Sequence, residues 1–429
     1  MTLDSAKDGL RLPQSATSGI VAAVGLLSFV AAVACVRLGR PFGNNLAQSA
    51  ILIIGAVTAA IFLVDLGWQK IHLRPSAGLD FARYDPSWGR TLTKFTGLLG
   101  CIGFVALGYR FLPEYQDKSY ENYFELLRYV IAPWLVLALP YFFWIDSKMR
   151  EPRDGYWHMG KFITLQWSSV DRRAVWQQLL GWVIKGYFAA LMIKYLCDDL
   201  KLLFLFNFDT LASFKSYFDF LYRSMFFVDV GLGAMGYIMA FRLTDTHIRS
   251  AEPTMLGWVV TLVCYEPFWP ALGRRYLAYD TGYAWDAWLA YKPLLYALWG
   301  SAILALLAIY LWATVSFGAR FSNLTHRGII TNGPYRWTKH PAYWAKCLSM
   351  WMMAVPFMPR GTPLDALHRC LLLLVVNFIY VMRAKTEEWH LSRDLVYVQY
   401  ALWMEEHGLF RFLRRLPLLR RLTYRQPGK

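Results

Sequence analysis

The stretch "PLLYALWGSAILALLAIYLWATVSF", residues 293–317, decides the fold class of this chain. It contains no charged side chain, and it exceeds the ~20 residues that an α-helix needs to cross a hydrocarbon core of ~30 Å. The same composition extends to the whole chain, because 56% of its 429 residues are hydrophobic and 17% are aromatic. The mean hydropathy of +0.30 is too high for an ordinary soluble protein of this length. The sequence therefore predicts an all-α fold, a polytopic transmembrane helical bundle.

Windows of about 19 residues predict about ten spans. Lys185 and Lys194 interrupt the fifth of these spans, and Glu266 and Pro267 shorten the seventh. The predicted spans cover residues 19–36, 46–68, 92–112, 125–145, 175–197, 220–242, 254–271, 293–317, 341–358 and 367–385.

The basic residues are distributed unevenly among the segments that connect these spans. Most of the 45 Lys and Arg residues lie in the N-terminal segment and in residues 70–91, 146–174, 242–253, 318–340 and 383–429. Short loops that are rich in Lys and Arg stay on the cytoplasmic side of a membrane. Both termini are therefore predicted to be cytoplasmic, and we expect a multi-pass protein of the bacterial inner (plasma) membrane.

The formal net charge of +16 does not indicate a nucleic-acid partner. The basic residues gather on one face and in the tail "RFLRRLPLLRRLTYR" (411–425), where attraction to anionic lipid headgroups explains them. We therefore expect membrane lipids as partners and no nucleic acid. The six cysteines show no C-x-x-C spacing, so we expect no metal site. Nothing in the sequence indicates an oligomeric state.

The segment "SAEPTMLGW" (250–258) divides the chain, because Pro253 and Gly257 break helical continuity there. Residues 1–250 form a predicted six-span N-terminal bundle of unknown role, and residues 251–429 form a four-span unit. We expect the two to be parts of one bundle.

One acidic residue, Asp229, lies inside a glycine-rich predicted span. An ionisable residue at such a position is expensive unless it has a partner or a function. Two interpretations are open: Asp229 pairs with Lys185 or Lys194 to hold the bundle together, or it contacts a substrate.

The stretch "NGPYRWTKHPAYWAK" (332–346) crowds polar and aromatic residues against a predicted span. Gly333-Pro334 is a turn signal, and His340-Pro341 has the form of a helix start, with proline at the first helical position. The open amide groups of such a helix end favour a carboxylate or a phosphate.

A second group of polar residues follows the last predicted span. At helical spacing Arg383, Glu387, His390 and Asp394 fall at i, i+4, i+7 and i+11, which predicts one continuous polar face. Two spans joined by a short turn run antiparallel. This face is therefore expected on the same membrane side as His340.

The order of these motifs resembles a known family. Gly-Pro-Tyr-Arg (333–336) is followed by a basic residue with His-Pro-x-Tyr (339–343), and then, after two closely spaced spans, by Arg-x-x-Thr-Glu-Glu (383–388). Over about 318–410 the chain resembles the isoprenylcysteine carboxyl methyltransferase family and its phospholipid-methylating relatives. The resemblance implies S-adenosyl-L-methionine bound at the cytoplasmic face, and methyl transfer to a lipophilic or lipid-linked carboxylate or amine.

The resemblance also implies roles for particular residues. The implied cofactor contacts are His340, Pro341, Tyr343, Tyr335, Glu387 and Glu388. The implied catalytic residues are Arg383, Glu387 and Arg336. A methyl sulfonium needs positioning more than acid–base chemistry, and Arg383 could orient an anionic group of the acceptor bidentately.

Three departures from the family pattern keep other interpretations open. Lys339 stands where the family usually has Arg, and Ala345 stands where Gly is usual and is followed by Lys346. The tail after Glu388 reaches Tyr397 and Tyr400 about one helical turn early and lacks the usual Gly there. A membrane reductase of the sterol or isoprenoid type, using NADPH, has a similar basic segment and acidic helix. A non-catalytic membrane protein that keeps only the pocket is the third interpretation.

Taken singly, several of these residues also have ordinary explanations. Trp337 and Trp344 fit an aromatic belt at the membrane interface. Lys339 fits an anchor on the cytoplasmic side, and His390 and Asp394 fit a solvated helix face.

Overall fold

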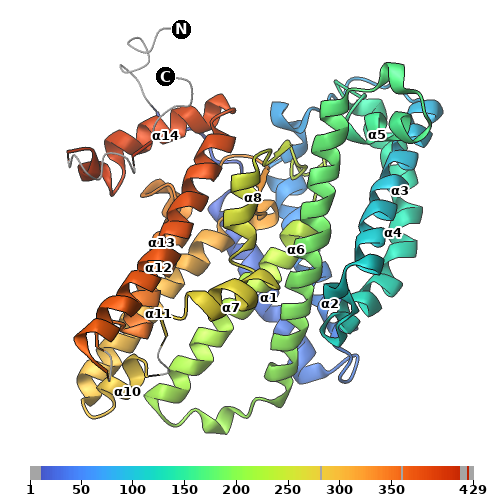
Figure 1. Cartoon of the computed structure of the whole chain (residues 1–429). Helices are drawn as coiled ribbons and strands as arrows, with labels where there is room; N and C mark the ends of the chain where they lie inside the picture. The colour runs from blue at the N-terminus through green and yellow to red at the C-terminus, as the bar shows by residue number, and fades with distance from the viewer. Residues whose placement is uncertain (1–10, 281–282, 359–360, 416–422, 425–429) are drawn as a thin grey trace.

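The computed structural model describes residues 11–280, 283–358, 361–415 and 423–424 (Figure 1). The two termini that were predicted to be cytoplasmic lie outside the described residues. So does most of the second half of the basic tail that was predicted to meet anionic lipids, residues 416–422 and 425.

The described residues form α-helices and one short pair of strands. The helices are α1 (Gly19–Gly39), α2 (Leu46–Phe62), α3 (Trp88–Phe111), α4 (Glu121–Lys148), α5 (Gly155–Ile163), α6 (Arg172–Leu205), α7 (Phe214–Ile238), α8 (Met255–Leu262), α9 (Arg274–Tyr276), α10 (Trp285–Leu289), α11 (Pro293–Val315), α12 (Pro341–Ala354), α13 (Pro363–Leu391) and α14 (Leu395–His407). The strands β1 (Ser250–Ala251) and β2 (Thr325–His326) pair antiparallel. The prediction of an all-α polytopic bundle is confirmed.

Local sequence signals explain where several helices begin. The Ser87 side chain accepts a hydrogen bond from the Arg90 backbone and caps α3. Thr362 and Asp365 form a reciprocal capping box at the start of α13. α11, α12 and α13 each begin with proline, whose missing N–H costs nothing at the first helical position.

Among the described residues, six helices are long and apolar enough to cross a membrane: α1, α2 with its π-helical extension to Trp68, α3, α4, α11 and α13. α6 and α7 are also long, with 34 and 25 residues. In α6 the charged side chains that interrupted the predicted span lower its hydropathy.

The prediction of ten spans is wrong for residues 254–271 and 341–358. α8 has 8 residues and α12 has 14, so at 1.5 Å per residue they are only about 12 and 21 Å long. The physical reasons are local. After α8 the chain carries Glu266, which pairs with Lys194 at 2.6 Å, and then Pro267. After α12 it turns at Val355, whose φ is 38°.

The segments that follow α2, α4, α7 and α11 meet at one end of the bundle, the upper end in Figure 1. Leu79, after α2, forms a backbone bridge with Met149, after α4. Ser250, after α7, pairs with His326, after α11. These are the segments whose basic residues predict a cytoplasmic location.

Both described ends of the chain lie at this same end of the bundle. The Gln399 side chain in α14 donates a hydrogen bond to the Arg11 carbonyl at 3.1 Å. Leu12 packs against the cluster that contains Tyr424. The geometry agrees with an even number of membrane crossings between the two ends.

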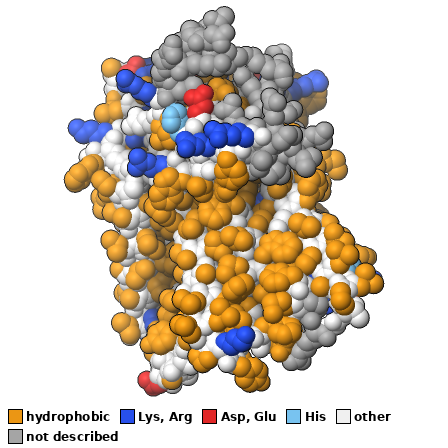
Figure 2. All heavy atoms as spheres, turned by 90° about the vertical axis from the view of Figure 1, so that its left-hand side faces the viewer, with side chains coloured by type: hydrophobic (Ala, Val, Ile, Leu, Met, Phe, Trp, Pro, Cys, Tyr) orange, Lys and Arg blue, Asp and Glu red, His pale blue; other side chains and the backbone are white. Residues whose placement is uncertain are grey.

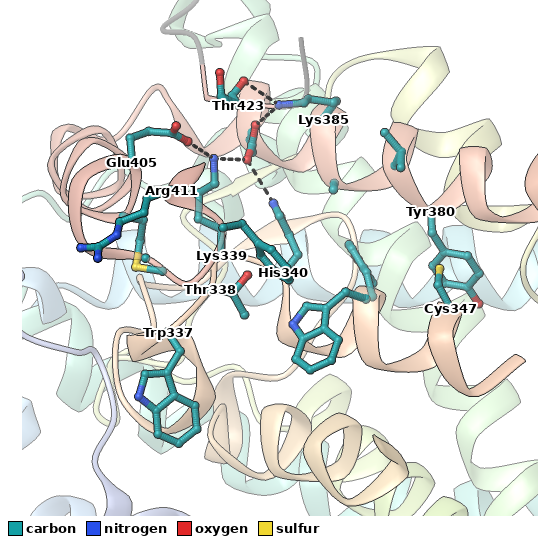
Figure 3. Close-up of a pocket in the computed structure, with 18 of the residues that line it drawn as sticks. Trp337, Thr338, Lys339, His340, Cys347, Tyr380, Lys385, Glu405, Arg411 and Thr423 are labelled. Carbon is teal, nitrogen blue, oxygen red and sulfur yellow. Dashed lines mark hydrogen bonds and ion pairs between the residues drawn. The ribbon is translucent and has the colours of Figure 1, made fainter. Parts of the chain in front are cut away.

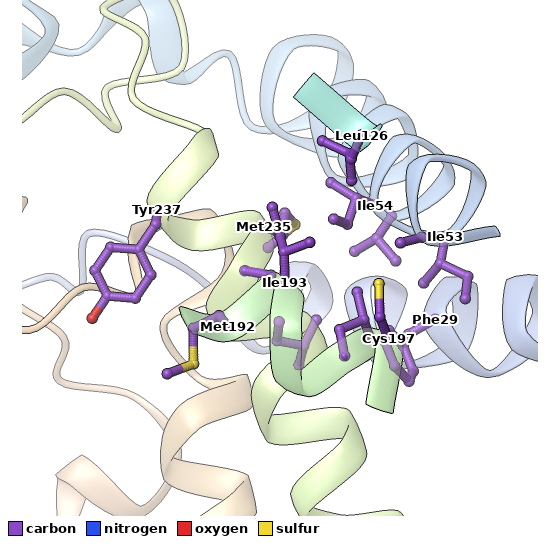
Figure 4. Close-up of a cluster of buried hydrophobic side chains, with 14 of the residues drawn as sticks. Phe29, Ile53, Ile54, Leu126, Met192, Ile193, Cys197, Met235 and Tyr237 are labelled. Carbon is purple, nitrogen blue, oxygen red and sulfur yellow. The ribbon is translucent and has the colours of Figure 1, made fainter. Parts of the chain in front are cut away.

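The largest cluster of buried hydrophobic side chains lies between α1, α2, α6 and α7 (Figure 4). Phe29, Ile53, Ile193 and Met235 contribute one side chain from each helix, and all are at most 2% exposed. Val315, at the end of α11, belongs to the same cluster. The core therefore crosses the boundary at residue 250 that the sequence suggested.

Hydrophobic side chains also cover the outside of α11 and α13. Figure 2 shows them over the middle of this face, while basic, acidic and histidine side chains gather above them. The exposed apolar side chains here include Leu294, Leu298, Leu367, Leu371, Leu374 and Phe378. This distribution is the one expected of helices that face a hydrocarbon core.

Candidate active site

The candidate site is built where α12 begins. Gly333, with a φ of +57°, starts a short 3-10 turn over Gly333–Arg336, as the Gly-Pro signal predicted. His340 occupies the N-cap position and Pro341 is the first residue of α12. The predicted helix start is therefore confirmed.

A buried carboxylate on α13 holds this helix start in place. Glu388 Oε1 lies 2.8 Å from Lys339 Nζ and 3.3 Å from His340 Nε2. Its other oxygen, Oε2, lies 2.9 Å from Lys385 Nζ. Figure 3 shows the three basic side chains converging from two segments. Glu388 is 3% exposed, so these ion pairs are shielded from solvent.

Lys339 extends the network toward α14. Its Nζ also lies 2.9 Å from Glu405 Oε1, and it sits 5.3 Å from the centre of the Tyr424 ring. Burial by itself lowers the pKa of the Lys339 ammonium. Glu388 and Glu405 outweigh that effect, and together they raise the pKa above its ordinary value. Lys339 therefore stays charged and links α13 to α14.

His340 and Tyr343 form a stacked pair at the start of α12. Their ring centres are 5.5 Å apart and their planes differ by 5°. The Tyr343 hydroxyl donates to Glu387 Oε2 at 3.0 Å, and His340 Nδ1 lies 3.8 Å from the same oxygen. Glu388 and Glu387 thus hold the pair from two sides.

Two cavities meet at this stacked pair. The first has a volume of about 320 Å³ and lies between α12, α13 and α14. The second has a volume of about 110 Å³ and lies between α8, α11, α12 and α13. Both are lined by the same four side chains, Lys339, His340, Tyr343 and Tyr380. Both cavities therefore border these side chains.

Arg383 lines the second cavity and is 6% exposed. Its Nη2 donates to Asn323 Oδ1 at 3.2 Å, and its guanidinium lies 5.1 to 5.7 Å from the rings of Tyr343, Tyr380 and Tyr265. Arg383 Nε has no hydrogen-bond partner among the described residues. A buried guanidinium with a free donor is suited to an anionic group.

Lys346 lines the same cavity, and Asp229 contacts Tyr310 and Thr314, which also line it. Lys346 sits 5.3 Å from the Tyr310 ring and 5.9 Å from the Tyr380 ring. Asp229 accepts hydrogen bonds from Tyr310 at 2.7 Å and Thr314 at 2.6 Å. The predicted pairing of Asp229 with Lys185 or Lys194 is wrong, because two hydroxyls of α11 satisfy the carboxylate instead.

The structure brings most of the predicted site residues together, but not all of them. Pro341 is buried at the start of α12, and the Tyr335 carbonyl accepts from the Tyr400 hydroxyl at 2.7 Å. Tyr335 also lines the second cavity. Arg336 is exposed and lines neither of the two cavities.

The predicted polar face of four residues is shorter than the sequence spacing suggested. α13 ends at Leu391, and Asp394 is the N-cap of α14. There Asp394 Oδ2 lies 2.7 Å from His326 Nε2, and this contact lowers the pKa of the carboxyl. His390 Nε2 lies 2.9 Å from Ser250 Oγ, so it faces β1 rather than solvent.

Three residues of the site were not anticipated from the sequence. Lys385 could have been found, because its i, i+3 spacing to Glu388 is that of a helical ion pair. Asn323 and Glu405 carry no such local signal. Asn323 is 60 positions from Arg383, and Glu405 reaches Lys339 across 66 positions.

One comparison with known proteins gives a match over this part of the chain. Residues 294–397, from the start of α11 into α14, match the family described as phospholipid methyltransferase. No curated protein and no solved structure matches the chain. The match includes the stacked pair, Arg383, Glu387 and Glu388. The C-terminal part of this chain therefore carries a domain of the phospholipid methyltransferase family, as its resemblance to the methyltransferases predicted.

Proposed function

We propose that this chain is an S-adenosyl-L-methionine-dependent methyltransferase of the membrane that methylates a lipophilic acceptor. One observation carries the proposal. The His340–Tyr343 pair, held by Glu387 and Glu388, borders both a cavity of about 320 Å³ and a smaller one that contains Arg383. Two reactants can therefore be held next to the same side chains.

The first cavity fits the cofactor in size and chemistry. Its volume of about 320 Å³ lies at the lower end of the range of about 300–1,000 Å³ that is usual for small-molecule sites. Tyr343 and Tyr380 offer aromatic faces to a cationic sulfonium. The amide groups at the start of α12 suit a carboxylate.

When bound, S-adenosyl-L-methionine would supply an electrophilic methyl group, and such a group needs an aligned acceptor and little water. The residues of this chain would do the positioning. Glu388 holds Lys339 and His340 against α13. Glu387 fixes the Tyr343 ring through its hydroxyl. The apolar face of α13 excludes water from the membrane side.

The second cavity favours an acceptor with a carboxylate. Arg383 and Lys346 line it, and Arg383 Nε is free to donate among the described residues. At about 110 Å³ the cavity holds only a headgroup, so the apolar part of the acceptor would lie along the membrane-facing helices. An amine acceptor is the second candidate, because Glu387 lines the same cavity with 41% of its side chain exposed.

Calorimetry with S-adenosylhomocysteine, the demethylated cofactor, tests the cofactor site. We expect wild type to bind, and His340→Ala and Glu388→Gln to bind at least tenfold more weakly, a loss of about 1.4 kcal/mol or more. Lys215→Met, in an exposed ion pair of α7, is the matched control and should bind normally. No binding to wild type, or equal binding by all variants, would refute the proposal. If wild type bound NADPH more tightly than S-adenosylhomocysteine, the result would instead support the interpretation as a membrane reductase.

Transfer of a radiolabelled methyl group to a membrane lipid extract tests the acceptor. A methyl ester of a carboxylate releases labelled methanol in alkali, whereas a methylated amine does not. We expect the alkali-labile product. Alkali-stable product would assign an amine, and cofactor binding without any labelled product would support the non-catalytic interpretation.

A further inference from the structure

A third cavity lies in the N-terminal part of the chain, outside residues 294–397. It has a volume of about 520 Å³ and is bounded by α3, α4, α5, α6 and the segment that follows α7. These helices form the right-hand side of Figure 1. The phospholipid methyltransferase domain does not include any of these helices, so the family match assigns this cavity no role.

The cavity holds a lysine without a partner. Lys185, on α6, lines the cavity and forms no hydrogen bond or ion pair with any residue that the structure describes. The centre of the Trp182 ring lies 5.1 Å from Lys185 Nζ. Lys185 is thirteen positions after the start of α6, or about 20 Å along the helix. A lone ammonium at that depth is costly unless an anion accompanies it.

A second lysine that lines the same cavity, Lys94, does have charged partners. Lys94, on α3, is 1% exposed, and its Nζ lies 2.8 Å from Asp146 Oδ1 and 3.5 Å from Asp154 Oδ2. Both carboxylates are therefore already committed to Lys94. They leave no negative charge for Lys185.

The segment after α7 adds further positive charge. Arg242 lines the cavity, and its Nη1 reaches only the Ala77 carbonyl, at 3.5 Å, among the described residues. Arg249, by contrast, pairs with Asp245 at 3.1 Å. His247 also lines the cavity. Burial and the neighbouring arginines lower its pKa well below the ordinary value, so its ring is neutral and can donate one hydrogen bond.

The remaining wall is apolar and lies at the membrane-facing helix α4. Trp134, Leu137 and Phe142 of α4 line the cavity together with Leu98 of α3. Leu137 is 66% exposed, and α4 is the least buried of the candidate membrane spans among the described residues. An apolar chain can therefore reach this wall from the bilayer.

From this arrangement we infer a second ligand site, one that binds an amphiphile with a single apolar chain and a phosphate or carboxylate group. Lys185 and Arg242 neutralise the anion, and the α4 side chains cover the apolar chain. The site is next to the candidate active site. Ser250 lines this cavity, and its Oγ lies 2.9 Å from Nε2 of His390, which lines the cavity of Arg383.

Binding of dodecyl phosphate to the purified full-length protein in a neutral detergent tests this site by calorimetry. We expect Lys185→Met to bind at least tenfold more weakly than wild type. Lys201→Met removes an exposed lysine from the same helix and should bind as wild type does. Ala138→Phe keeps every cation but fills the cavity from α4, so it should also weaken binding.

Two further probes test the contributions of the apolar chain and of the negative charge separately. Inorganic phosphate should bind far more weakly than dodecyl phosphate, because it lacks the apolar chain. Dodecyltrimethylammonium should not bind, because it carries the wrong charge. Equal binding of dodecyl phosphate by wild type and Lys185→Met would overturn the inference. It would also be overturned if wild type bound inorganic phosphate or dodecyltrimethylammonium as tightly as dodecyl phosphate.

Folding of the variants is checked without the probe. Lys185→Met removes an unpaired charge, so its thermal midpoint should equal or exceed that of wild type. It should also keep its affinity for S-adenosylhomocysteine. Because that affinity is measured separately, a failure of the proposed methyltransferase function would leave this second site standing, and the reverse also holds.

Discussion

The role of Lys339 in the structure differs from the role that the sequence suggests. In the sequence it is one more cytoplasmic lysine, and it departs from the arginine that the family usually has. In the structure its ammonium lies within 3 Å of two carboxylates, Glu388 and Glu405, which come from different helices. An arginine can also satisfy two carboxylates, because its planar fork carries five donors.

Lys339→Met removes the partner that Glu388 and Glu405 share, while Glu388 keeps His340 and Lys385, so it should destabilise the fold by about 1–3 kcal/mol. Lys339→Arg should remain close to wild type. Thermal unfolding in detergent measures both. Lys215→Met, whose pair with Asp219 is about half exposed, should cost less than ~1 kcal/mol. A tolerated Lys339→Met would show that the network does not stabilise the fold.

The raised pKa of Lys339 also sets the pH range of this contribution. A group whose pKa is higher in the folded state stabilises fully below its unfolded pKa, and the stabilisation disappears as the pH rises through the folded value. The difference in unfolding midpoint between wild type and Lys339→Met should therefore stay constant from pH 7 to about pH 10. A difference that shrinks between pH 7 and 9 would contradict it.

At the scale of helices, close packing explains how α5 is held against α3. A Cβ on Gly97 would lie 2.0 Å from the Tyr156 carbonyl oxygen, and a Cβ on Gly160 would lie 1.9 Å from the Thr93 carbonyl oxygen. Small residues let two helix backbones approach to this distance. Because both obstacles are backbone atoms, no side-chain rotation can relieve them.

Two glycines of α3, Gly97 and Gly103, provide a matched pair of substitutions. Gly97→Ala should destabilise by about 1–3 kcal/mol, because α5 must move away from α3. Gly103→Ala, where a Cβ would meet nothing within 4 Å, should be neutral or slightly stabilising, since alanine has the higher helix propensity. Thermal midpoints of the two variants measure the difference. Equal midpoints would mean that the close approach of α3 and α5 does not matter for stability.

At the scale of the whole molecule, the two predicted parts share one core. Val315 packs with side chains of α1, α2, α6 and α7, and β1 pairs with β2 across the proposed boundary. We therefore expect that residues 251–429 expressed alone do not yield a monodisperse protein. Co-expression with residues 1–250 should restore it, as judged by size-exclusion chromatography. A well-behaved C-terminal fragment that binds S-adenosylhomocysteine would show that the two parts are independent.

The orientation of the bundle is a prediction from its basic residues and has its own test. A green fluorescent protein fused to the C-terminus should fluoresce, because it folds in the cytoplasm. Alkaline phosphatase, which is active only outside the cytoplasm, should be inactive there. It should be active when inserted between α3 and α4. The opposite pattern of activities would reverse the orientation.

Much of the architecture was predictable because its causes are local in the sequence. Long apolar runs predict membrane helices, and proline at the first helical position predicted the start of α12 at Pro341. The span count failed at α8, which is followed by Glu266 and Pro267, and at α12, which ends at the turn of Val355, because both segments are still apolar in composition. The family resemblance also depends on short motifs, and residues 294–397 confirmed it.

The sequence by itself determined the fold class, the helix starts and the motif that the methyltransferases share. Only the tertiary structure decided which charges meet. It paired Glu388 with Lys339, His340 and Lys385, it gave Asp229 two hydroxyls instead of a lysine, and it gave Lys185 no charged partner among the described residues. The physical reason is distance along the chain. Hydropathy and helix caps act within a few residues, whereas an ion pair depends on which helices pack together and on how much water they exclude.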